Sequence, residues 1–381
     1  MKKFKCMATC ASGLEALVGK ELRAMGIECQ LENGHALFMG TMEDIAKASL
    51  WLRTADRIKI IVAQFPATTF TQLFDYTAAI PWEKLLPLDA NIHVTGKSVK
   101  STLFSVPDCQ SITKKAIVQR LSNYYHRYGR LPESGAKFPV EVALLKDKVT
   151  LSLDTTGDSF FKRGYRTEKG GAPLKETLAA ALVSLTNWRP DRPFVDPTCG
   201  SGTICIEAAM MALNIAPGLH RKFLCEDWPW VEEEIFANAR QEAKAAIRWD
   251  QSLQIFGSDI DHRLVEIAKD NAKKAGVADY IEFKQMRLQD FHTDQQYGVI
   301  VSNPPYGERL NDKEEVEQLY KEMGEVFRPL KTWSKYILTS DLNFEAYYGE
   351  KATKKRKLYN GALRTDYFQY WGERPPKPKR K

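Results

Sequence analysis

The sequence has few of the residues that build metal centres or disulfide frameworks. Its 381 residues include seven cysteines, which is an odd number, and six histidines. No two cysteines form a C-x-x-C pair, so the spacing favours neither a zinc site nor a disulfide-stabilised secreted fold. We therefore expect reduced thiols, no bound metal and a cytoplasmic location.

The sequence also lacks a long apolar run. No uninterrupted apolar stretch is long enough to cross a bilayer, and Glu15 interrupts the stretch that follows the basic start Met1–Lys5. Hydrophobic residues make up 44% and charged residues 27% of the chain, which is ordinary for a globular protein with room for two or three domains. The composition thus predicts neither a membrane partner nor a signal peptide, and it does not indicate an oligomeric state.

A third absence concerns phosphate-binding loops. Strand-like residues 192–195 lead into a loop with Gly200 and Gly202, where the backbone can turn sharply and approach a ligand. Cys205 replaces the third glycine of the dinucleotide fingerprint, and no Lys-Ser/Thr pair follows as in a P-loop. Asp196 would repel a pyrophosphate and attract a cation, such as a ligand with an ammonium or sulfonium group. The pattern predicts a site for a cationic cofactor; a tight turn without a ligand is the alternative.

Two later strands also end in acidic residues. Asp259 follows a strand over 255–258 and is placed to hold ribose hydroxyls, whereas Asp261 is placed to cap the next helix, 262–275. Asp290 follows a strand over 280–284 and could accept the amino group of an adenine. The alternative is that these acids only cap helices or lie in loops. A helical insertion over 231–249 accounts for the long separation of Asp196 from Asp259.

The tetrapeptide Asn303-Pro304-Pro305-Tyr306 carries the most specific chemistry. It follows the apolar run 298–302, which reads as a buried strand, and its two prolines force the chain to turn. The Asn303 side-chain oxygen and the Pro304 carbonyl can each accept an N–H bond from an exocyclic amine, while a base can stack on Tyr306. These residues predict methylation of an exocyclic amine on a nucleobase; a proline-rich turn without chemistry is the alternative.

Together these loops resemble the S-adenosylmethionine-dependent methyltransferases of the Rossmann-like class. The lead-in 163–166 and 172–181, and the extended motif 303–309, resemble those of RNA methyltransferases that carry a THUMP domain, above all the large-subunit ribosomal RNA guanine-N2 group. The resemblance implies S-adenosylmethionine as cofactor and guanine N2 in RNA as target, with ribosomal RNA favoured over transfer RNA. Adenine-N6 methylation of nucleic acid and a non-catalytic RNA-binding assembly factor stay open as alternatives.

The resemblance also implies roles for individual residues. It assigns Asn303, Pro304, Pro305 and Tyr306 to the target base and Arg309 to RNA. The residues that it assigns to the cofactor lie in the three loops and at the start of the catalytic motif: Asp196, Thr198, Gly200, Gly202, Thr203, Asp259, Ile260, Asp290 and Asn303.

The order of predicted elements indicates an α/β protein with three units. Strands at 4–9, 36–39 and 58–65 and helices at 13–25 and 42–50 predict a ferredoxin-like unit over 1–65. A helix over 69–79, a strand over 91–96, a helix over 111–128 and a hairpin over 140–154 resemble a THUMP domain, expected over 66–160. A Rossmann-like methyltransferase domain with a seven-stranded, mostly parallel sheet is expected over 161–372, followed by a disordered basic tail, 373–381.

Charge suggests where RNA binds. The net charge is +7, with basic residues in excess before residue 164 and after residue 350 and acidic residues in excess between them. Basic flanks around an acidic core are expected if the RNA backbone is contacted outside the cofactor domain. The candidate phosphate contacts in the THUMP-like unit are Lys97, Lys100, Lys114, Lys115, Arg120 and Arg127. Individually, each could equally be a solvated surface charge.

A hairpin is predicted near the carboxyl end. Asn360 and Gly361 lie between two strand-like runs, and this dipeptide favours a two-residue type I′ turn. A strand over 333–339 should precede it. The hairpin would add an antiparallel strand to the edge of the parallel sheet.

Overall fold

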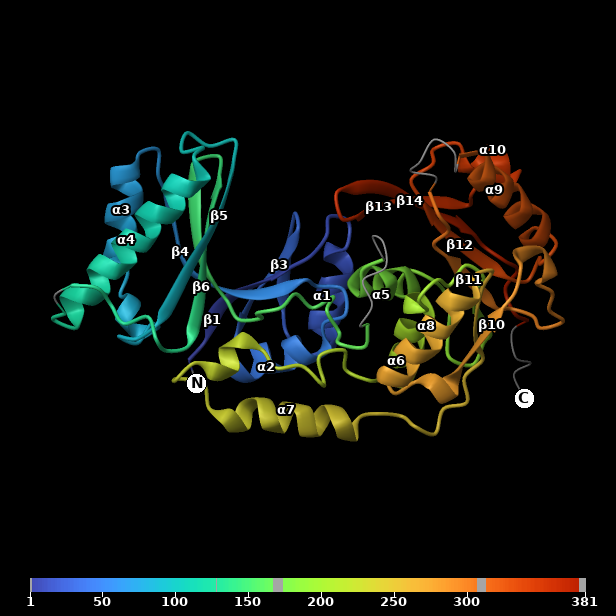
Figure 1. Cartoon of the computed structure of the whole chain (residues 1–381), viewed down its shortest axis with the longest axis horizontal. Helices are drawn as coiled ribbons and strands as arrows, with labels where there is room; N and C mark the ends of the chain where they lie inside the picture. Colours follow the sequence, from blue (N-terminus) through green and yellow to red (C-terminus); the bar gives the residue numbers. More distant parts are fainter. Residues whose placement is uncertain (1, 128, 167–173, 307–312, 377–381) are drawn as a thin grey trace.

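The strands of this protein form two seven-stranded sheets that lie side by side (Figure 1). The computed structural model describes residues 2–127, 129–166, 174–306 and 313–376. The first sheet is built from residues before 155 and the second from residues after 193. Within the described ranges, no helix is both long and apolar enough to span a bilayer.

The amino-terminal unit has the predicted β-α-β-β-α-β order. Its antiparallel strands run β2-β3-β1-β4 across the sheet, and a capping box between Thr41 and Asp44 starts its second helix. The sequence did not locate β2, because this short strand carries polar, largely exposed side chains. The elements are β1 (Phe4–Thr9), α1 (Glu15–Ala24), β2 (Cys29–Glu32), β3 (His35–Gly40), α2 (Met42–Trp51) and β4 (Arg57–Pro66).

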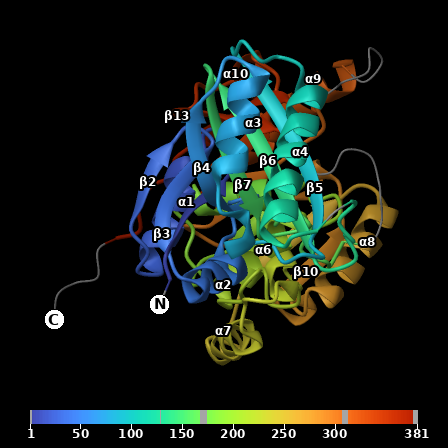
Figure 2. The ribbon, with the colours of Figure 1, turned by 90° about the vertical axis from the view of Figure 1, so that its left-hand side faces the viewer.

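The second unit extends the same sheet. Strand β7 pairs antiparallel with β4, followed by β6 and β5, so that β4 belongs to both units. Helices α3 and α4 lie together over this part of the sheet (Figure 2). The elements are α3 (Phe70–Ala79), the short 3-10 helix η1 (Trp82–Lys84), β5 (Asn91–Val99), α4 (Val106–Tyr124), β6 (Lys137–Leu145) and β7 (Lys148–Asp154).

The predicted limits of α4 were wrong. The helix begins at Val106 rather than 111, because Pro107 fits the first turn of a helix, where no N–H bond is lost. It ends at Tyr124, before the predicted limit, and residue 128 lies outside the described residues.

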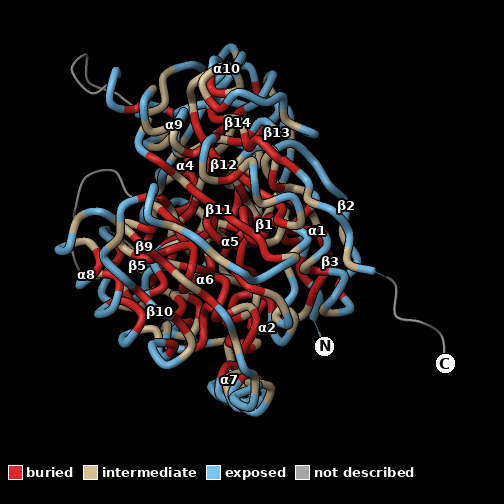
Figure 3. The backbone as a smooth tube through the Cα atoms, turned by 90° about the vertical axis from the view of Figure 1, so that its right-hand side faces the viewer, coloured by how far each residue is buried: buried red, intermediate tan, exposed pale blue. Residues whose placement is uncertain are grey.

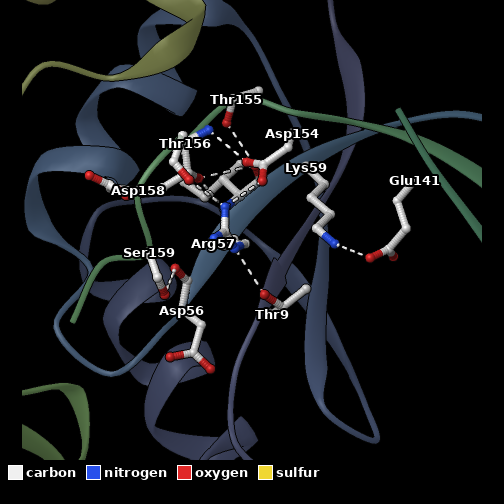
Figure 4. Close-up of polar contacts among 12 residues, drawn as sticks. Thr9, Asp56, Arg57, Lys59, Glu141, Asp154, Thr155, Thr156, Asp158 and Ser159 are labelled. Carbon is white, nitrogen blue, oxygen red and sulfur yellow. Dashed lines mark hydrogen bonds and ion pairs between the residues drawn. The ribbon is translucent and has the colours of Figure 1, made fainter. Parts of the chain in front are cut away.

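Polar contacts hold the junction between the two units (Figure 4). Arg57 donates to the Asp154 carboxylate and to the Gly157 carbonyl. The backbone N–H of Ile58 donates to Thr156 Oγ1 at 2.9 Å, and the Lys59 ammonium lies 2.7 Å from the Glu141 carboxylate. These contacts run from β4 to β6, to the end of β7 and to the segment after it, so they bond the described parts of the two units to each other.

The second sheet has the strand order β10-β9-β8-β11-β12-β14-β13. Only β14 runs antiparallel to the rest, which confirms the predicted mostly parallel sheet. Its strands are β8 (Phe194–Asp196), β9 (Ile255–Asp259), β10 (Ile281–Gln285), β11 (Val299–Ser302), β12 (Ser334–Thr339), β13 (Lys354–Asn360) and β14 (Leu363–Tyr370). Its helices are α5 (Glu176–Ser184), α6 (Thr203–Ala212), α7 (Glu233–Ala245), α8 (His262–Lys274), α9 (Lys313–Phe327) and α10 (Phe344–Tyr348), with 3-10 turns η2 (Leu224–Asp227), η3 (Ala278–Tyr280) and η4 (Leu288–Asp290).

Two hydrophobic cores fill the molecule. One extends from the first sheet through α5, α6 and α8 to the second sheet, and Figure 3 shows buried residues gathered in the interior with exposed residues around them. The other lies between the second sheet and helices α9 and α10. Because this core is shared, the face of the second sheet that α5, α6 and α8 cover packs against the amino-terminal half.

The hairpin near the carboxyl end is present, but its turn differs from the prediction. Asn360 pairs with Leu363, so the two loop residues are Gly361 and Ala362. Only Gly361 has a positive φ, +65°, whereas a type I′ turn requires two such residues. Glycine at the first loop position is typical of a type II′ turn, and this explains the shift of one residue.

The predicted helical insertion before β9, together with Trp228 and Trp230 just before it, contacts both amino-terminal units. Helix α7 lies along α2 (Figures 1 and 2). Trp228 stacks on Phe138 with ring centroids 5.0 Å apart, and Trp230 Nε1 donates to the Leu85 carbonyl at 2.9 Å. The insertion therefore attaches the second sheet to the THUMP-like unit.

A buried ion pair joins the same parts from the other side. Arg163 and Glu207 side chains are 2% and 0% exposed, and Arg163 Nε lies 3.3 Å from Glu207 Oε1. Arg163 also donates to the carbonyls of Arg53 and Phe160, and the Tyr165 hydroxyl donates to Glu207. One carboxylate on α6 thus organises the segment between the two halves of the molecule.

We predict that Arg163→Met lowers the free energy of unfolding by roughly 3–5 kcal/mol, because it leaves the Glu207 carboxylate buried without its cation. Denaturant titration measures the loss. The double variant Arg163→Met/Glu207→Met should recover a large part of it, since neither charge remains. A double variant less stable than Arg163→Met would contradict this account of the pair.

Candidate functional site

The predicted cofactor loop follows β8 and is fixed by backbone hydrogen bonds. The N–H of Thr198 donates to Asp196 Oδ1 at 3.2 Å, and the N–H of Cys199 donates to the Ser258 carbonyl at 2.8 Å. The N–H of Gly200 donates to Asp259 Oδ2 at 3.0 Å. The ends of β8 and β9 are therefore bonded to each other, as expected for two loops that share one ligand.

The two loop glycines meet different requirements. Both have positive φ, +50° at Gly200 and +79° at Gly202. A Cβ on Gly202 would lie 2.8 Å from Phe283 Cζ and 2.9 Å from Ala268 Cβ, whereas a Cβ on Gly200 would meet nothing within 4 Å. Gly202 is needed for close packing of the loop against β10 and α8, and Gly200 keeps the space beside the loop open.

Asp196 is a buried carboxyl with an altered pKa. It is 1% exposed, and burial, together with the nearby Asp259 charge, raises its pKa well above the ordinary value, against the lowering effect of the Thr198 N–H. A buried acid of this kind favours a cationic ligand, because the cation stabilises the ionised form. Burial also raises the pKa of Cys199, so this thiol stays protonated and is no nucleophile.

The other predicted cofactor residues line the carboxyl ends of the next strands. Asp259 accepts from the N–H of Gly200 and, at 3.0 Å, from the N–H of Asp261, which itself caps α8 as predicted. Ile260 is 65% exposed and offers an apolar surface. Asp290 is exposed at the end of η4 and borders a cavity of about 290 Å³ that Phe291 also lines. Their contacts with a cofactor stay a prediction.

The catalytic tetrapeptide forms the turn directly after β11. Pro304 is buried, Pro305 is exposed, and Asn303 and Tyr306 are half-buried. The Tyr306 hydroxyl donates to Asn303 Oδ1, so the predicted amine acceptor and the residue predicted to stack on the base are in contact with each other. Tyr320 on α9 supports the turn by donating to the Pro305 carbonyl at 3.2 Å.

One contact joins the catalytic turn to the cofactor loop. Ser302, the last residue of β11, has its hydroxyl 2.7 Å from that of Thr198. The Asn303 side chain is therefore held next to the loop that carries Asp196. The role of Ser302 could not be predicted from the sequence, because a serine at the end of a strand has no distinctive pattern.

The predicted RNA-contacting residues differ in whether they already form ion pairs within the protein. Lys97, Lys114 and Arg120 form ion pairs with Glu141, Glu133 and Glu83. Lys115 and Arg127 line a polar hollow of about 570 Å³ beside α4, whereas Lys100 lies after β5 with a positive φ of 49°. Arg309 lies outside the described residues. All seven stay predictions, and the hollow beside α4 is the better candidate surface.

Two residues near the cofactor loop were missed in the sequence. Arg166 donates to Thr203 Oγ1 at 2.6 Å, and Glu176 lies beside Arg166. Both lie in the lead-in segment that resembles that of the RNA methyltransferases. Their positions were therefore part of the resemblance, but the contact of Arg166 with α6 was not predicted. Among the described residues, no cluster of three or more His, Cys, Asp or Glu could hold a metal.

The fold and this arrangement define a Rossmann-like methyltransferase of the S-adenosylmethionine-dependent class. Comparison with known families agrees: residues 163–369 match the RMKL-like methyltransferase domain, residues 5–59 the RlmL ferredoxin-like domain and residues 67–154 the THUMP domain. The chain belongs to the RMKL-like methyltransferase family. The three matches fall within the proposed units 1–65, 66–160 and 161–372, whose limits stay a prediction.

Relatives with assigned names share most of this chain. "Putative RNA methyltransferase YpsC" of Bacillus subtilis (strain 168) is 56% identical over 381 residues, covering 100% of this chain and 99% of that protein. Ribosomal RNA large subunit methyltransferase K/L of Syntrophotalea carbinolica is 34% identical over 383 residues, covering 94% of this chain and 52% of that protein. The chain thus spans about half the length of the K/L relative.

Solved structures show the same fold over the whole chain. A crystal structure from Listeria monocytogenes str. 4b F2365, described as a predicted N6-adenine-specific DNA methylase, is 59% identical with a TM-score of 0.94, covering 98% of this chain and 97% of that one. The structure of "SMU.472, a putative methyltransferase complexed with SAH" is 56% identical with a TM-score of 0.94, covering 99% and 100%.

We predict that Gly202→Ala raises the dissociation constant for S-adenosylhomocysteine at least tenfold, because the added methyl group overlaps Phe283 and Ala268 and the backbone has a positive φ. Calorimetry measures binding. Gly276→Ala, just after α8, is the matched control, because its φ of +72° brings strain of about 1–2 kcal/mol but an added Cβ there meets nothing within 4 Å, and it should bind more tightly than Gly202→Ala. Wild-type affinity in Gly202→Ala would contradict the packing argument.

We also predict that binding of S-adenosylmethionine strengthens as pH rises through the raised pKa of Asp196. The free carboxyl binds its proton to higher pH than usual, and the cation favours the ionised form, so binding releases a proton. Calorimetry in buffers of different ionisation enthalpy measures this release. Asp196→Asn should bind S-adenosylmethionine more weakly and without proton release. If the variant kept the pH profile of the wild-type protein, Asp196 would not be the source of the released proton.

Proposed function

We propose that this protein transfers a methyl group from S-adenosylmethionine to N2 of a guanine in structured RNA, with large-subunit ribosomal RNA as the favoured substrate. One observation supports the proposal above the others. Asn303, which would accept a hydrogen bond from the amine, lies in the turn directly after β11. The contact of 2.7 Å between the Ser302 and Thr198 hydroxyls fixes this turn to the cofactor loop. Amine and methyl donor would therefore meet at the junction of two bonded loops.

The residues present fit the proposed cofactor. S-adenosylmethionine supplies an electrophilic methyl group when bound. The buried Asp196 carboxyl suits its positive charge, the space beside Gly200 admits the ligand, and the exposed face of Ile260 suits its adenine. Asp259 keeps acceptor capacity for ribose hydroxyls beyond its two backbone bonds, because each carboxylate oxygen has two lone pairs.

The catalytic turn would orient and activate the amine. An exocyclic amine is a poor nucleophile, because its lone pair is delocalised into the ring. Hydrogen bonds from its two N–H groups to Asn303 Oδ1 and the Pro304 carbonyl would direct the lone pair toward the methyl group, and Tyr306 would stack on the base. In this structure Asn303 Oδ1 accepts from Tyr306, so the entering amine would replace that bond. Catalysis is then mostly orientation.

Bond formation would create a positively charged nitrogen, which is strongly acidic. The new N–C bond forms as the S–C bond breaks, and the nitrogen then releases one proton to water. No general base is required for this step, and the acceptor role of Asn303 would continue until the proton leaves.

The amino-terminal half would bind the RNA. A base in a duplex cannot reach the turn after β11 unless it is rotated out of its stack. The polar hollow beside α4, with Lys115 and Arg127, would contact the phosphate backbone. The guanine assignment follows the resemblance to the guanine-N2 methyltransferases, and the K/L relative favours ribosomal RNA.

A second candidate is methylation of adenine N6. The description of the Listeria structure supports it, and Asn303 and Pro304 would bind that amine equally well. The two reactions differ in the nucleoside that they produce.

We predict that Asn303→Ala lowers methyl transfer to RNA at least 100-fold and leaves the dissociation constant for S-adenosylhomocysteine nearly unchanged. Labelled methyl transfer to RNA from a strain lacking the protein, followed by digestion to nucleosides, measures the product. Asn238→Ala on the exposed face of α7 is the matched control. Normal turnover in Asn303→Ala would refute the acceptor role, and label in N6-methyladenosine would favour the second candidate.

A further inference from the structure

The first residues of α6 are contacted by a cation from a distant part of the sequence. Arg166 Nη2 donates to Thr203 Oγ1 at 2.6 Å and to the Leu174 carbonyl at 2.9 Å. Thr203 is the first residue of α6 and directly follows Gly202 of the cofactor loop. A guanidinium charge is therefore fixed where the glycine loop enters the helix.

Glu176 accompanies this cation and is almost completely buried. Its side chain is 4% exposed and that of Arg166 is 13% exposed, with Arg166 Nε 3.8 Å from Glu176 Oε1. Among the described residues, neither Arg166 Nε nor Glu176 Oε2 has a hydrogen-bond partner. Buried polar atoms are almost always paired in native proteins, so this pair is incomplete as it stands.

The start of α6 offers further positive charge. Gly202 caps the helix without a side-chain hydrogen bond, so the amides of the first turn are left for another acceptor. Helix N-termini favour anions, and Arg166 adds its guanidinium at the same place, partly offset by the Glu176 carboxylate 3.8 Å away. The local field thus favours a carboxylate.

The proposed cofactor carries such a group. Its methionine end has one carboxylate and one ammonium, in addition to the sulfonium. The buried Asp196 lies at the other end of the same loop and suits a cation. The loop therefore has a buried acid before its glycines, and the guanidinium of Arg166 is bonded to Thr203 directly after them, which suits the opposite charges of a zwitterion.

We propose that Arg166 binds the carboxylate of the cofactor's methionine end and that Glu176 is the positioning residue that holds the guanidinium in place. The inference rests on the proposed cofactor but not on the identity of the methylated base. Arg166 uses Nη2 for its hydrogen bonds to Thr203 and Leu174. Its Nη1 has no hydrogen bond to any described residue and is therefore available for this contact.

Comparison of three ligands isolates this contact. S-adenosylhomocysteine has the complete amino-acid end, 5′-methylthioadenosine lacks it, and decarboxylated S-adenosylhomocysteine lacks only the carboxylate. We expect Arg166→Met to raise the dissociation constant for S-adenosylhomocysteine by roughly 10- to 100-fold, since hydrogen bonds between charged groups are strong. The constants for the other two ligands should change less than about twofold.

Three further variants complete the experiment. Arg166→Lys should recover part of the affinity for S-adenosylhomocysteine, and Glu176→Gln should weaken this ligand selectively but less than Arg166→Met does. Arg189→Met is the matched control, because Arg189 is exposed and precedes the amino end of β8, whereas the cofactor loop follows the carboxyl end of this strand. If Arg166→Met does not fold, Arg166→Lys is compared across the same three ligands.

Selective weakening of S-adenosylhomocysteine supports the proposal. Equal weakening of all three ligands would overturn it, because Arg166 would then only hold the segment before α5 against α6. Unchanged affinities would overturn it as well. If the wild-type protein bound none of the three, the cofactor assignment itself would fail, which is a different result from a failure of Arg166 alone.

Discussion

The buried contact between Arg163 and Glu207 is the constraint on which the rest of the structure depends. Glu207 lies on α6, one turn after the cofactor loop, and Arg163 reaches from it to the carbonyls of Arg53 and Phe160 in the amino-terminal half. Two opposite charges without access to water are stable only while both stay in place. The pair therefore sets the position of the amino-terminal half relative to the cofactor loop, and the contact of Trp228 with Phe138 sets it a second time. A nucleotide held by the first sheet would reach the catalytic turn from a fixed distance.

The chemistry proposed for the site needs this rigidity. The rate of the proposed methyl transfer depends on how well the amine, its lone pair and the methyl donor are aligned. The Ser302–Thr198 and Gly200–Asp259 contacts bond three strand ends to one another, and Tyr320 supports the turn from α9. Tyr306 and Asn303 form the part of the site that can rearrange, since their mutual hydrogen bond has to open before a base can enter.

Much of this could be predicted from the sequence, because strand ends carry local signals. The apolar run before Asn303, the glycines after Asp196 and the helix cap at Asp261 each stand within a few residues of their structural role. Contacts between distant segments could not be predicted: Arg166 meets Thr203 across 37 residues and Arg163 meets Glu207 across 44. Fine details of local geometry were also missed. The helix predicted from 111 begins at Val106, with Pro107 in its first turn, and Asn360 looked like a turn residue although it ends β13. Local patterns show which residues carry chemistry, and packing decides which of them meet.

The most direct test of the account compares the modified nucleosides of large-subunit ribosomal RNA from cells with and without this protein. Mass spectrometry of the digested RNA should show the loss of one N2-methylguanosine when the protein is absent, restored by the wild-type chain. Loss of N2-methylguanosine from transfer RNA instead would keep the chemistry and change the substrate. An unchanged content of N2-methylguanosine in both RNA classes would contradict the central claim.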